Sequence, residues 1–384
     1  MQNSVSHHFV PQWYQRQFLP PEGGEFLVLD KSPATHVVGG DGKRRPIRSP
    51  RSTFRCGPKK LFQKPGLYSA ALRGVPDDAI ERIVFGRLDD IGAKAASLFS
   101  DWPVSNGFFS PNDDQIPEKY GHPSHRMQDL LEYLDAQKAR TPKGIAQIKT
   151  VLARAGRLGA SNTVLMQHLL NRRKVNCTVW AEGVWEIFSA KKASIKFILS
   201  DDPVVIYNLD CYPASLACQY PNDPDPFWRG SRVIFPLSPD AVLVISHIEH
   251  VDDPSRQKAQ RPRRNARSYD ETLISHTDIV NNRELSDENV ATINYVLKTR
   301  AVRYVASQIT DFLYPEKIVD NPKWCDIDRI FHAKHPSWRG ETETYIRYKD
   351  GTIRHSNAFG ERDIVPGWFV RQQEAKKGNA EETE

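Results

Sequence analysis

The spacing of hydrophobic residues changes along the chain and separates a helical middle from a strand-rich stretch after it. Over residues 77–99 and 125–170, apolar positions recur every three or four residues, which predicts amphipathic helices. Over 178–246 the apolar runs are short and rich in Val, Ile, Phe and Trp, which is typical of strands. Because helices are followed by strands and do not alternate with them, the pattern predicts an α+β fold, with the helical middle packed on a mainly antiparallel sheet.

Local signals refine these elements. An N-cap at Asp77-Asp78 begins the first helix, and Arg140-Thr141-Pro142 marks a break, because proline disfavours a helical residue before it. Residues 32–60 are polar and basic and are expected to form a long loop. The helices are expected within 77–172 and over 287–308. Strands are expected over 25–29, 178–182, 184–188, 195–199, 204–207, 233–235 and 242–246.

The pattern also predicts how the chain divides. Residues 1–312 are expected to form a single α+β domain, and residues 313–371 a C-terminal extension. In the extension, residues 345–348 and 352–355 flank Lys349-Asp350-Gly351, a strong signal for a β-hairpin. Residues 372–384 are charged and lack large apolar side chains, so a disordered tail is expected there.

Composition excludes several classes of protein. Hydrophobic residues make up 39% of the 384 residues, which indicates a folded globular protein. No apolar stretch approaches the roughly 20 residues that span a bilayer, and no signal-peptide layout opens the chain, so we expect a cytoplasmic protein without a membrane partner. The five cysteines include no Cys-x-x-Cys pair, and no motif for a nucleotide cofactor, a P-loop or a zinc peptidase occurs.

The most unusual segment is 6–18, which places His7, His8, Gln12 and Arg16 among aromatic residues. These residue types serve in acid–base catalysis and metal binding. Adjacent residues of a strand point to opposite faces, so one imidazole could face a cleft while the other is hydrogen-bonded to the backbone. The segment also looks like the first strand of an HNH-type nuclease finger. The alternative is structural: His8 bridges backbone groups while the neighbouring aromatic residues pack in the core.

The segment 7–18 reads His-His-Phe-Val-Pro-Gln-Trp-Tyr-Gln-Arg-Gln-Phe and resembles the opening signature of an uncharacterised microbial family, domain of unknown function 4238. Later segments resemble the same family in the same order, so that the resemblance covers about residues 6–310. The family has no agreed activity, and the resemblance therefore implies positions of interest rather than a reaction. The later matching segments are Arg140-Thr141-Pro142, 197–205, 235–239 and the helical run 294–307.

Asp201-Asp202 is a second candidate site, because it follows an apolar run and precedes Pro203. Two carboxylates at a strand end suit a divalent cation such as Mg²⁺ or Mn²⁺. The pair could equally cap a turn, since Ser-Asp-Asp-Pro is strong turn chemistry. Arg16 and Arg140 are candidate clamps for phosphate, because a guanidinium donates two parallel hydrogen bonds. Their structural alternative is an ion pair that holds helices against the sheet.

The net charge of +6 is concentrated in basic runs. Lys43–Arg55 and Arg256–Arg267 are the two runs that could follow the phosphates of a nucleic acid. Runs of this kind are also common in solvated loops.

Two hypotheses for function follow from these residues. The first is a metal-dependent phosphodiesterase or nuclease acting on nucleic acid. In it, His8, with His7 beside it, supplies the general base or a metal ligand, Asp201 and Asp202 bind the cation, Arg16 and Arg140 clamp phosphate, and Gln12 orients water. The second is a non-catalytic binding or accessory protein, of the kind found in bacterial defence or toxin loci, whose signature residues form a structural polar network.

Overall fold

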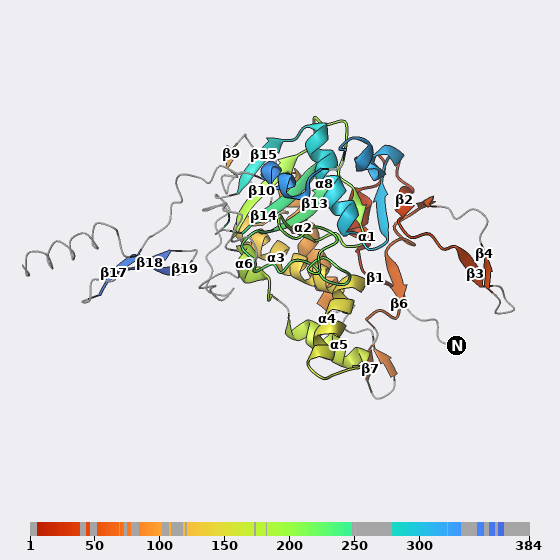
Figure 1. The fold of residues 1–384 in the computed structure, drawn as a ribbon, viewed down its shortest axis with the longest axis horizontal. Coiled ribbons are helices and arrows are strands. Elements are labelled where there is room, and N and C mark those ends of the chain that lie inside the picture. The colour runs from red at the N-terminus through yellow and green to blue at the C-terminus, as the bar shows by residue number, and fades with distance from the viewer. Residues whose placement is uncertain are drawn as a thin grey trace, which may run out of the picture.

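The computed structural model has an α+β fold (Figure 1). The residues that it describes are 6–38, 44–46, 52–68, 70–72, 75–77, 84–101, 107–108, 118–119, 121–172, 174–181, 183–247, 250, 279–320, 322–331, 344–348, 353–357 and 360–364. The run Arg256–Arg267, the turn Lys349-Asp350-Gly351 and the tail 372–384 lie outside these residues.

A six-stranded sheet forms the centre, in the order β12-β13-β14-β10-β15-β9. Neighbouring strands are antiparallel, except that β10 and β15 run parallel. The mainly antiparallel sheet predicted from the sequence is therefore confirmed. The strands are β9 (Gly107–Phe108), β10 (Val184–Ser189), β12 (Val205–Asn208), β13 (Ser231–Ser238), β14 (Ala241–Ser246) and β15 (Val280–Glu284).

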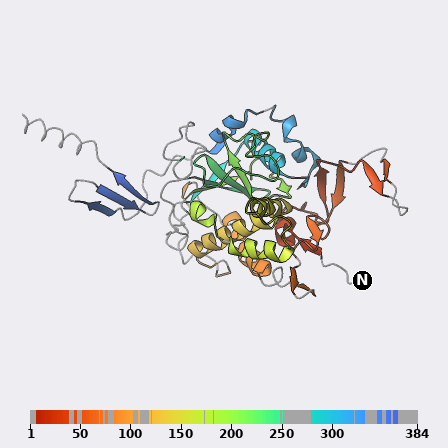
Figure 2. The same ribbon diagram turned by 60° about the horizontal axis from the view of Figure 1, so that its bottom comes forward.

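Both faces of this sheet are buried along β10, β12, β13 and β14, because alternate side chains of these strands enter two separate hydrophobic clusters. Trp185 and Ile187 of β10 belong to the larger cluster, and Phe188 belongs to the smaller one. Helices cover each face, as Figure 2 shows with the sheet between two helical layers. Strands buried on both sides read as continuous apolar runs, which explains why β10 and β14 lack a polar alternation.

The first helical layer contains α2 (Gly86–Asp101), α3 (Pro123–Arg140), α4 (Pro142–Arg154), α5 (Asn162–Asn171) and α6 (Cys177–Ala181). The predicted break after α3 is confirmed. Thr141 has an extended backbone, its hydroxyl accepts a hydrogen bond from the N–H of Gly144, and Pro142 begins α4. This is a standard N-cap followed by proline at the first helical position.

The N-terminal segment docks on this layer. Strand β1 (Ser6–His8) pairs with β6 (Gln63–Pro65), and helix α1 (Gln12–Gln17) follows, at the right of Figure 1. Beside it lies a four-stranded antiparallel sheet in the order β11-β16-β2-β5. Its strands are β2 (Phe26–Asp30), β5 (Thr53–Cys56), β11 (Leu199–Ser200) and β16 (Tyr304–Ser307).

The opposite face of the central sheet packs against α8 (Asp287–Arg300) and the 3₁₀ helices η6 (Thr310–Leu313), η7 (Pro315–Lys317) and η8 (Trp324–Phe331). Phe312, Ile327 and Phe331 are buried members of the smaller hydrophobic cluster. Residues 313–331, which the sequence pattern placed in an extension, are thus packed into the core.

Several predicted elements are corrected by the structure. Residues 178–182 are expected as a strand, but Cys177–Ala181 form helix α6, because a short apolar run fits either element and packing decides between them. The helix expected from residue 77 begins after that residue, since Val75–Asp77 form strand β8 paired with β7 (Ala70–Leu72). Helix α8 ends at Arg300, before β16. Of the expected strand 195–199, only Leu199 lies in a strand, β11 (Leu199–Ser200). The expected loop 32–60 contains β3 (His36–Val38), β4 (Arg44–Pro46) and β5.

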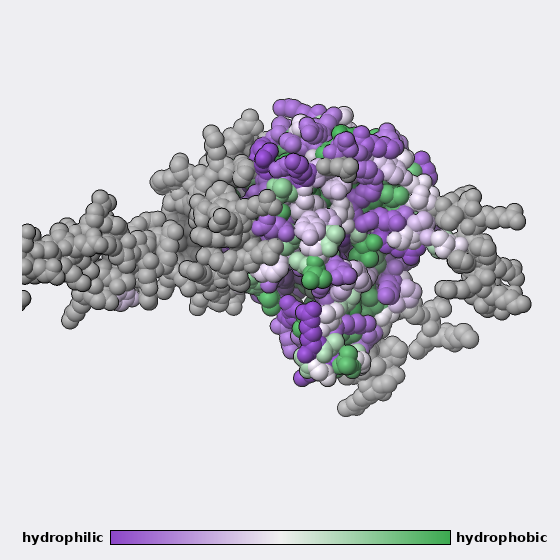
Figure 3. Space-filling view, in the orientation of Figure 1, coloured by the Kyte–Doolittle hydropathy of each residue, from purple (hydrophilic) through white to green (hydrophobic). Residues whose placement is uncertain are grey.

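At the C-terminal end, β17 (Thr344–Arg347) and β18 (Ile353–Asn357) pair as the predicted hairpin, and β19 (Gly360–Ile364) adds a third strand. Within the described part of the chain, no helix combines the length and the apolar character needed to cross a membrane. In Figure 3 the described surface is mostly hydrophilic, and hydrophobic residues appear in small separate patches.

Tyr14 joins the N-terminal segment to the central sheet. Its fully buried hydroxyl donates to the backbone oxygen of Pro236 in β13, at 2.6 Å, and its ring stacks on Phe235. We expect Tyr14→Phe to lower the free energy of unfolding by about 1–3 kcal/mol, because it leaves a buried carbonyl without its donor. Chemical denaturation measures the change. Tyr212→Phe, at a side chain that is 57% exposed, is the matched control and should have no effect.

Candidate functional site

His7 is buried in the core. Its Nδ1 accepts a hydrogen bond of 3.0 Å from the backbone N–H of Tyr68, and the two rings stack with centroids 5.3 Å apart. Only 1% of the residue is exposed. The lone pair that a general base would need is therefore already occupied, and His7 serves to attach β1 to the segment after β6.

His8 lies half-buried on the opposite face of β1. Its Nε2 is 3.1 Å from the backbone oxygen of Pro58 and 3.5 Å from Nε2 of Gln12, whose amide oxygen accepts from the guanidinium of Arg16 at 3.1 Å. Burial lowers the pKa of His8, although the backbone oxygens of Lys59 and Pro58 oppose this effect. The imidazole is thus mainly neutral near pH 7. The structure brings three of the predicted site residues together here: His8, Gln12 and the exposed Arg16.

Arg140 lies elsewhere, in the core. Its guanidinium donates to a carboxylate oxygen of Asp89 at 2.6 Å and to the amide oxygen of Gln137 at 2.7 Å. It also lies over the rings of Phe85 and Tyr133, with its central carbon 5.4 and 5.7 Å from their centroids. With 1% of the residue exposed, this geometry corresponds to the structural alternative, an ion pair that holds α3 to α2.

Asp201 caps the backbone that follows α8. Its two carboxylate oxygens accept from the N–H groups of Val302, Arg303 and Tyr304 at 2.7–2.9 Å. Burial raises the pKa of Asp201, while these three hydrogen bonds lower it. The side chain therefore fixes the turn between α8 and β16, which lies 101–103 residues further along the chain and is not the local Ser-Asp-Asp-Pro turn that the sequence suggests.

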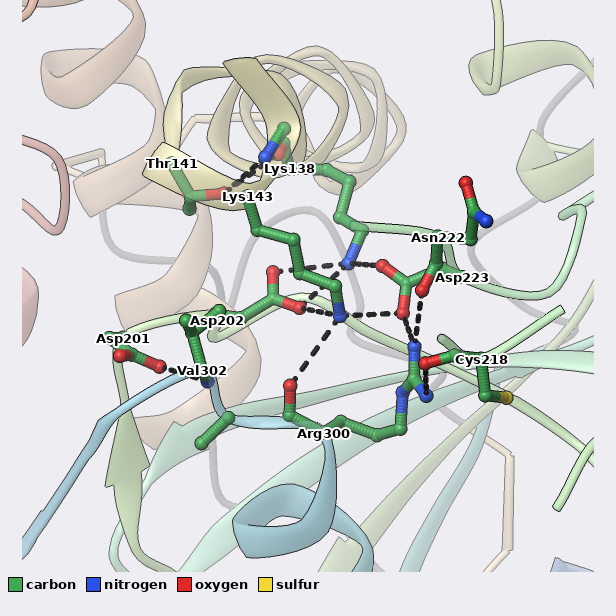
Figure 4. A network of polar contacts seen from close by, with 12 residues as sticks. Lys138, Thr141, Lys143, Asp201, Asp202, Cys218, Asn222, Asp223, Arg300 and Val302 are labelled. Carbon is green, nitrogen blue, oxygen red and sulfur yellow. Dashed lines mark hydrogen bonds and ion pairs between the residues drawn. The ribbon is translucent and has the colours of Figure 1, made fainter. Parts of the chain in front are cut away.

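Asp202 points into a buried ion network, which we call the Asp202 network (Figure 4). Lys138 donates to both of its carboxylate oxygens at 3.0 Å, and Lys143 donates to one of them at 2.8 Å. The same two lysines lie 2.5 and 2.7 Å from the carboxylate of Asp223, which also pairs with the guanidinium of Arg300. Four segments that are distant in sequence meet in this network.

Arg300 extends the network to the loop after β12. Its guanidinium donates to the backbone oxygens of Cys218 and Asn222, at 3.2 and 2.9 Å. The 209–228 loop is therefore attached to the end of α8 by hydrogen bonds as well as by charge. It carries three exposed apolar side chains, those of Tyr212, Leu216 and Tyr220.

The Asp202 network contains three cations and two carboxylates, all nearly excluded from solvent. Burial tends to raise the pKa of Asp202, but the ammonium groups of Lys138 and Lys143 outweigh it and hold the pKa below its usual value. Burial lowers the pKa of Lys138 to about 7, although Asp202 opposes the change. The network therefore carries one surplus positive charge, which Lys138 releases as a proton near neutral pH.

These surroundings do not fit a divalent cation at Asp201 and Asp202. The oxygens of Asp202 face two ammonium groups, which would repel a metal ion, and those of Asp201 are occupied by backbone donors. No group of three or more His, Cys, Asp or Glu side chains with metal-binding geometry occurs among the described residues. The expected cation ligands Asp201 and Asp202 are therefore structural carboxylates.

A basic surface lies around His8 and consists of five exposed side chains that make no ion pair with a described carboxylate. The contact of His8 with Pro58 places residues 59 and 60 beside it, and the pairing of His7 with Lys64 places β6 next to β1. An acidic residue in this region is Glu25. Burial raises the pKa of the Cys56 thiol, the charge of Glu25 adds to this rise, and the charge of Lys60 opposes it. The members of the basic surface are Arg16, Arg55, Lys59, Lys60 and Lys64.

Sequence reasoning missed the partners of Asp202 and a second buried polar cluster. In that cluster Arg232 pairs with Asp328, at 2.8 Å, and Asp328 lies 3.2 Å from the imidazole of His250. Glu186 is buried on the same face of the sheet. The sequence signal for this second cluster is a charged residue inside an apolar run, such as Glu186 in Val-Trp-Glu-Ile-Phe, because charged side chains are rarely buried without a partner.

Comparison of the chain with family models, with curated protein sequences and with solved structures gives no match. The assignment of chemistry therefore depends on the geometry described above.

The Asp202 network has three cations and two carboxylates, and this count predicts that losing a carboxylate lowers the free energy of unfolding more than losing one lysine does. Asp202→Asn leaves three cations facing one carboxylate and should lower the free energy of unfolding by about 3–5 kcal/mol. Lys138→Met leaves two cations facing two carboxylates and should change it by about 1 kcal/mol or less. Denaturant unfolding measures both. The control is Asp320→Asn, at an exposed position. Equal losses for Asp202→Asn and Lys138→Met would contradict the charge count.

The lowered pKa of Lys138 also predicts a dependence of stability on pH. Between about pH 7 and its ordinary value of 10.5, the unfolded chain binds the Lys138 proton and the folded chain does not. The free energy of unfolding should therefore rise with pH in this window, by up to about 1.4 kcal/mol per pH unit. Denaturation midpoints of the wild type and of Lys138→Met between about pH 7 and 9.5 test this. The difference between the two proteins should change with pH, and parallel curves would exclude it.

Proposed function

We propose that this protein binds nucleic acid through the basic surface around His8, and that the signature segment is the folded support of that surface. The observation that carries the proposal is that Arg16, Arg55, Lys59, Lys60 and Lys64 are exposed, lie on adjoining elements and make no ion pair with a described carboxylate. Exposed cations without an ion-pair partner favour the binding of a polyanion such as nucleic acid, because each phosphate contact releases condensed counterions.

The neighbours of these cations suit a phosphate backbone. Gln12 and His8 contribute neutral hydrogen-bonding groups between the charged side chains, and the hydroxyl of Ser6 lies at the same edge, where it donates to Gln63 at 2.8 Å. Amides, hydroxyls and basic side chains are the groups that contact phosphates in most protein–DNA complexes. The surface contains Arg55 from the basic run predicted to contact nucleic acid, and the lysines extend it.

Binding without hydrolysis is the better supported of the two hypotheses. The phosphodiesterase hypothesis assigned Asp201 and Asp202 to a cation and Arg140 to phosphate, and these three side chains have buried intramolecular partners instead. His8, Gln12 and Arg16 retain access to solvent, and in this proposal they contact the ligand without activating water. A relation to the family of domain of unknown function 4238 is part of the same proposal.

The test is binding of a fluorescein-labelled oligonucleotide, measured by fluorescence anisotropy at several salt concentrations. We expect Lys59→Gln/Lys60→Gln/Lys64→Gln to weaken binding about tenfold or more and to reduce the slope of log K against log salt by about 2–3, since each lost phosphate contact contributes about 0.9. The matched control is Lys149→Gln/Lys191→Gln/Lys192→Gln, which removes the same charge from three exposed positions outside the basic surface.

Two outcomes would contradict the proposal. Equal weakening by both triple variants would show that net charge alone attracts the oligonucleotide. Cleavage of the oligonucleotide with Mg²⁺ present, abolished by His8→Ala in a protein that still unfolds cooperatively, would support the phosphodiesterase instead. Single-stranded and duplex forms of the probe, compared in the same assay, establish which form the basic surface prefers.

A further inference from the structure

Glu186 is a buried carboxyl group without a hydrogen-bond partner. It lies in β10 opposite Val244 of β14 and Val280 of β15, and only 1% of the residue is exposed. Neither of its carboxyl oxygens is hydrogen-bonded to any part of the chain that the structure describes. Buried polar groups in folded proteins are nearly always paired, so an unpaired carboxyl in a central strand calls for an explanation.

The protonation state of Glu186 follows from this environment. Burial raises the pKa of Glu186 to about 8, while the positive charges of Arg232 and Arg283 oppose the rise. At neutral pH the side chain is therefore mainly protonated and uncharged. On losing its proton it becomes a buried carboxylate, and Arg232 is a buried cation on the same face of the sheet, because Glu186 lies opposite Val244 and Arg232 opposite Ser246 of β14.

Arg232 is already bound to helix η8. Its Nε donates to Asp328 at 2.8 Å, another guanidinium nitrogen donates to Ser246, and its central carbon lies 5.4 Å from the ring centroid of Phe331. Burial would raise the pKa of Asp328, but hydrogen bonding to His250 and the charge of Arg232 hold it well below its usual range. The ion pair between Arg232 and Asp328 is thus the principal charged contact between η8 and the sheet.

Trp324 marks the start of the same helix. Its indole N–H donates to the backbone oxygen of Asn208 at 2.9 Å, and its own backbone oxygen accepts from the hydroxyl of Tyr207 at 2.7 Å. The Tyr207 and Trp324 rings lie 5.1 Å apart. The indole of Trp324 therefore reports directly whether η8 is docked on β12.

We propose that Glu186, Arg232 and Asp328 form a proton-controlled latch that holds η8 on the central sheet. With Glu186 protonated, Arg232 is bound to Asp328 and η8 is docked. When Glu186 loses its proton, the new carboxylate competes with Asp328 for the guanidinium, and the contact of η8 with the sheet weakens. Two carboxylates that share one buried arginine cannot both be neutralised.

The other ionisable groups around this latch do not supply the proton that we assign to Glu186. Arg283 faces it from β15, where it is exposed and lies over the ring of Phe188, 5.3 Å from the centroid. His250 is bound to Asp328, and burial keeps Tyr207 protonated because it raises the pKa of that hydroxyl. Opposite Glu186, β14 presents Val244, which has no charge.

The sign of the effect on stability follows from the raised pKa. Between the ordinary value of 4.5 and about 8, the folded protein binds the Glu186 proton and the unfolded chain does not, so stability falls as pH rises through this window. Glu186→Gln keeps the shape of the protonated side chain and removes the proton equilibrium. This variant should fold, and it should gain stability over the wild type as the pH increases.

The experiment is ¹⁹F NMR of the full chain labelled with 5-fluorotryptophan, titrated from about pH 6 to about pH 9.5. The Trp324 resonance is assigned from its absence in Trp324→Phe. We expect this resonance to move with a midpoint near pH 8 in the wild type and to stay in its low-pH position in Glu186→Gln. In Asp328→Asn, which removes the charge that holds Arg232, we expect the high-pH position already at pH 6.

Two results would overturn the latch. A Trp324 resonance that does not titrate in the wild type would show that η8 is insensitive to the protonation of Glu186. A titration that persists unchanged in Glu186→Gln would assign it to a group other than Glu186. The remaining seven tryptophan resonances serve as the internal control, because a general loss of packing would move them together.

Discussion

The structure depends above all on the balance of buried charge around Asp202. Removing five ionised side chains from water has a large desolvation cost, which is offset only when opposite charges face each other at short distance and the remaining donors are hydrogen-bonded. Asp202 and Asp223 supply the opposite charges for Lys138, Lys143 and Arg300, and two nitrogens of Arg300 also donate to the backbone oxygens of Cys218 and Asn222. The network thereby joins the corner between α3 and α4, the loop after β12 and the end of α8 to one another.

The N-terminal segment is held by a second set of polar contacts that begins on the same helix as Lys138. The amide of Gln137 donates to the backbone oxygen of Phe9 at 2.8 Å and accepts from Arg140, which pairs with Asp89. The amide of Gln15 donates to the backbone oxygens of Val10 and Leu61 at 2.7 and 3.3 Å. The buried polar residues of the signature, such as Gln15, are therefore used to position backbone, while His8, Gln12, Arg16 and the neighbouring lysines retain access to solvent.

The sequence predicts what is encoded locally. The break at Thr141-Pro142 and the strands β10, β12 and β14 each follow from neighbouring residues. The other members of the Asp202 network could not be predicted in this way, because they come from positions about 60 residues before Asp202, about 20 after it and about 100 after it, and no spacing rule relates such positions. The prediction of a strand over 178–182 fails for a related reason. The apolar run suits a strand, and only its packing makes Cys177–Ala181 a helix.

The two buried polar clusters differ in how their charges are satisfied. Because of this difference, the Asp202 network stabilises the fold, whereas the cluster around Arg232 can respond to pH. In the Asp202 network each carboxylate has at least two cationic partners, so the loss of one lysine proton leaves the remaining pairs intact. Around Arg232 the guanidinium serves Asp328, and Glu186 has no hydrogen-bond partner among the described residues. A buried group that can gain a charge without gaining a partner must disturb a neighbour when it ionises. The cluster at β10, β13 and η8 is therefore a part of the core in which a single proton can change the packing.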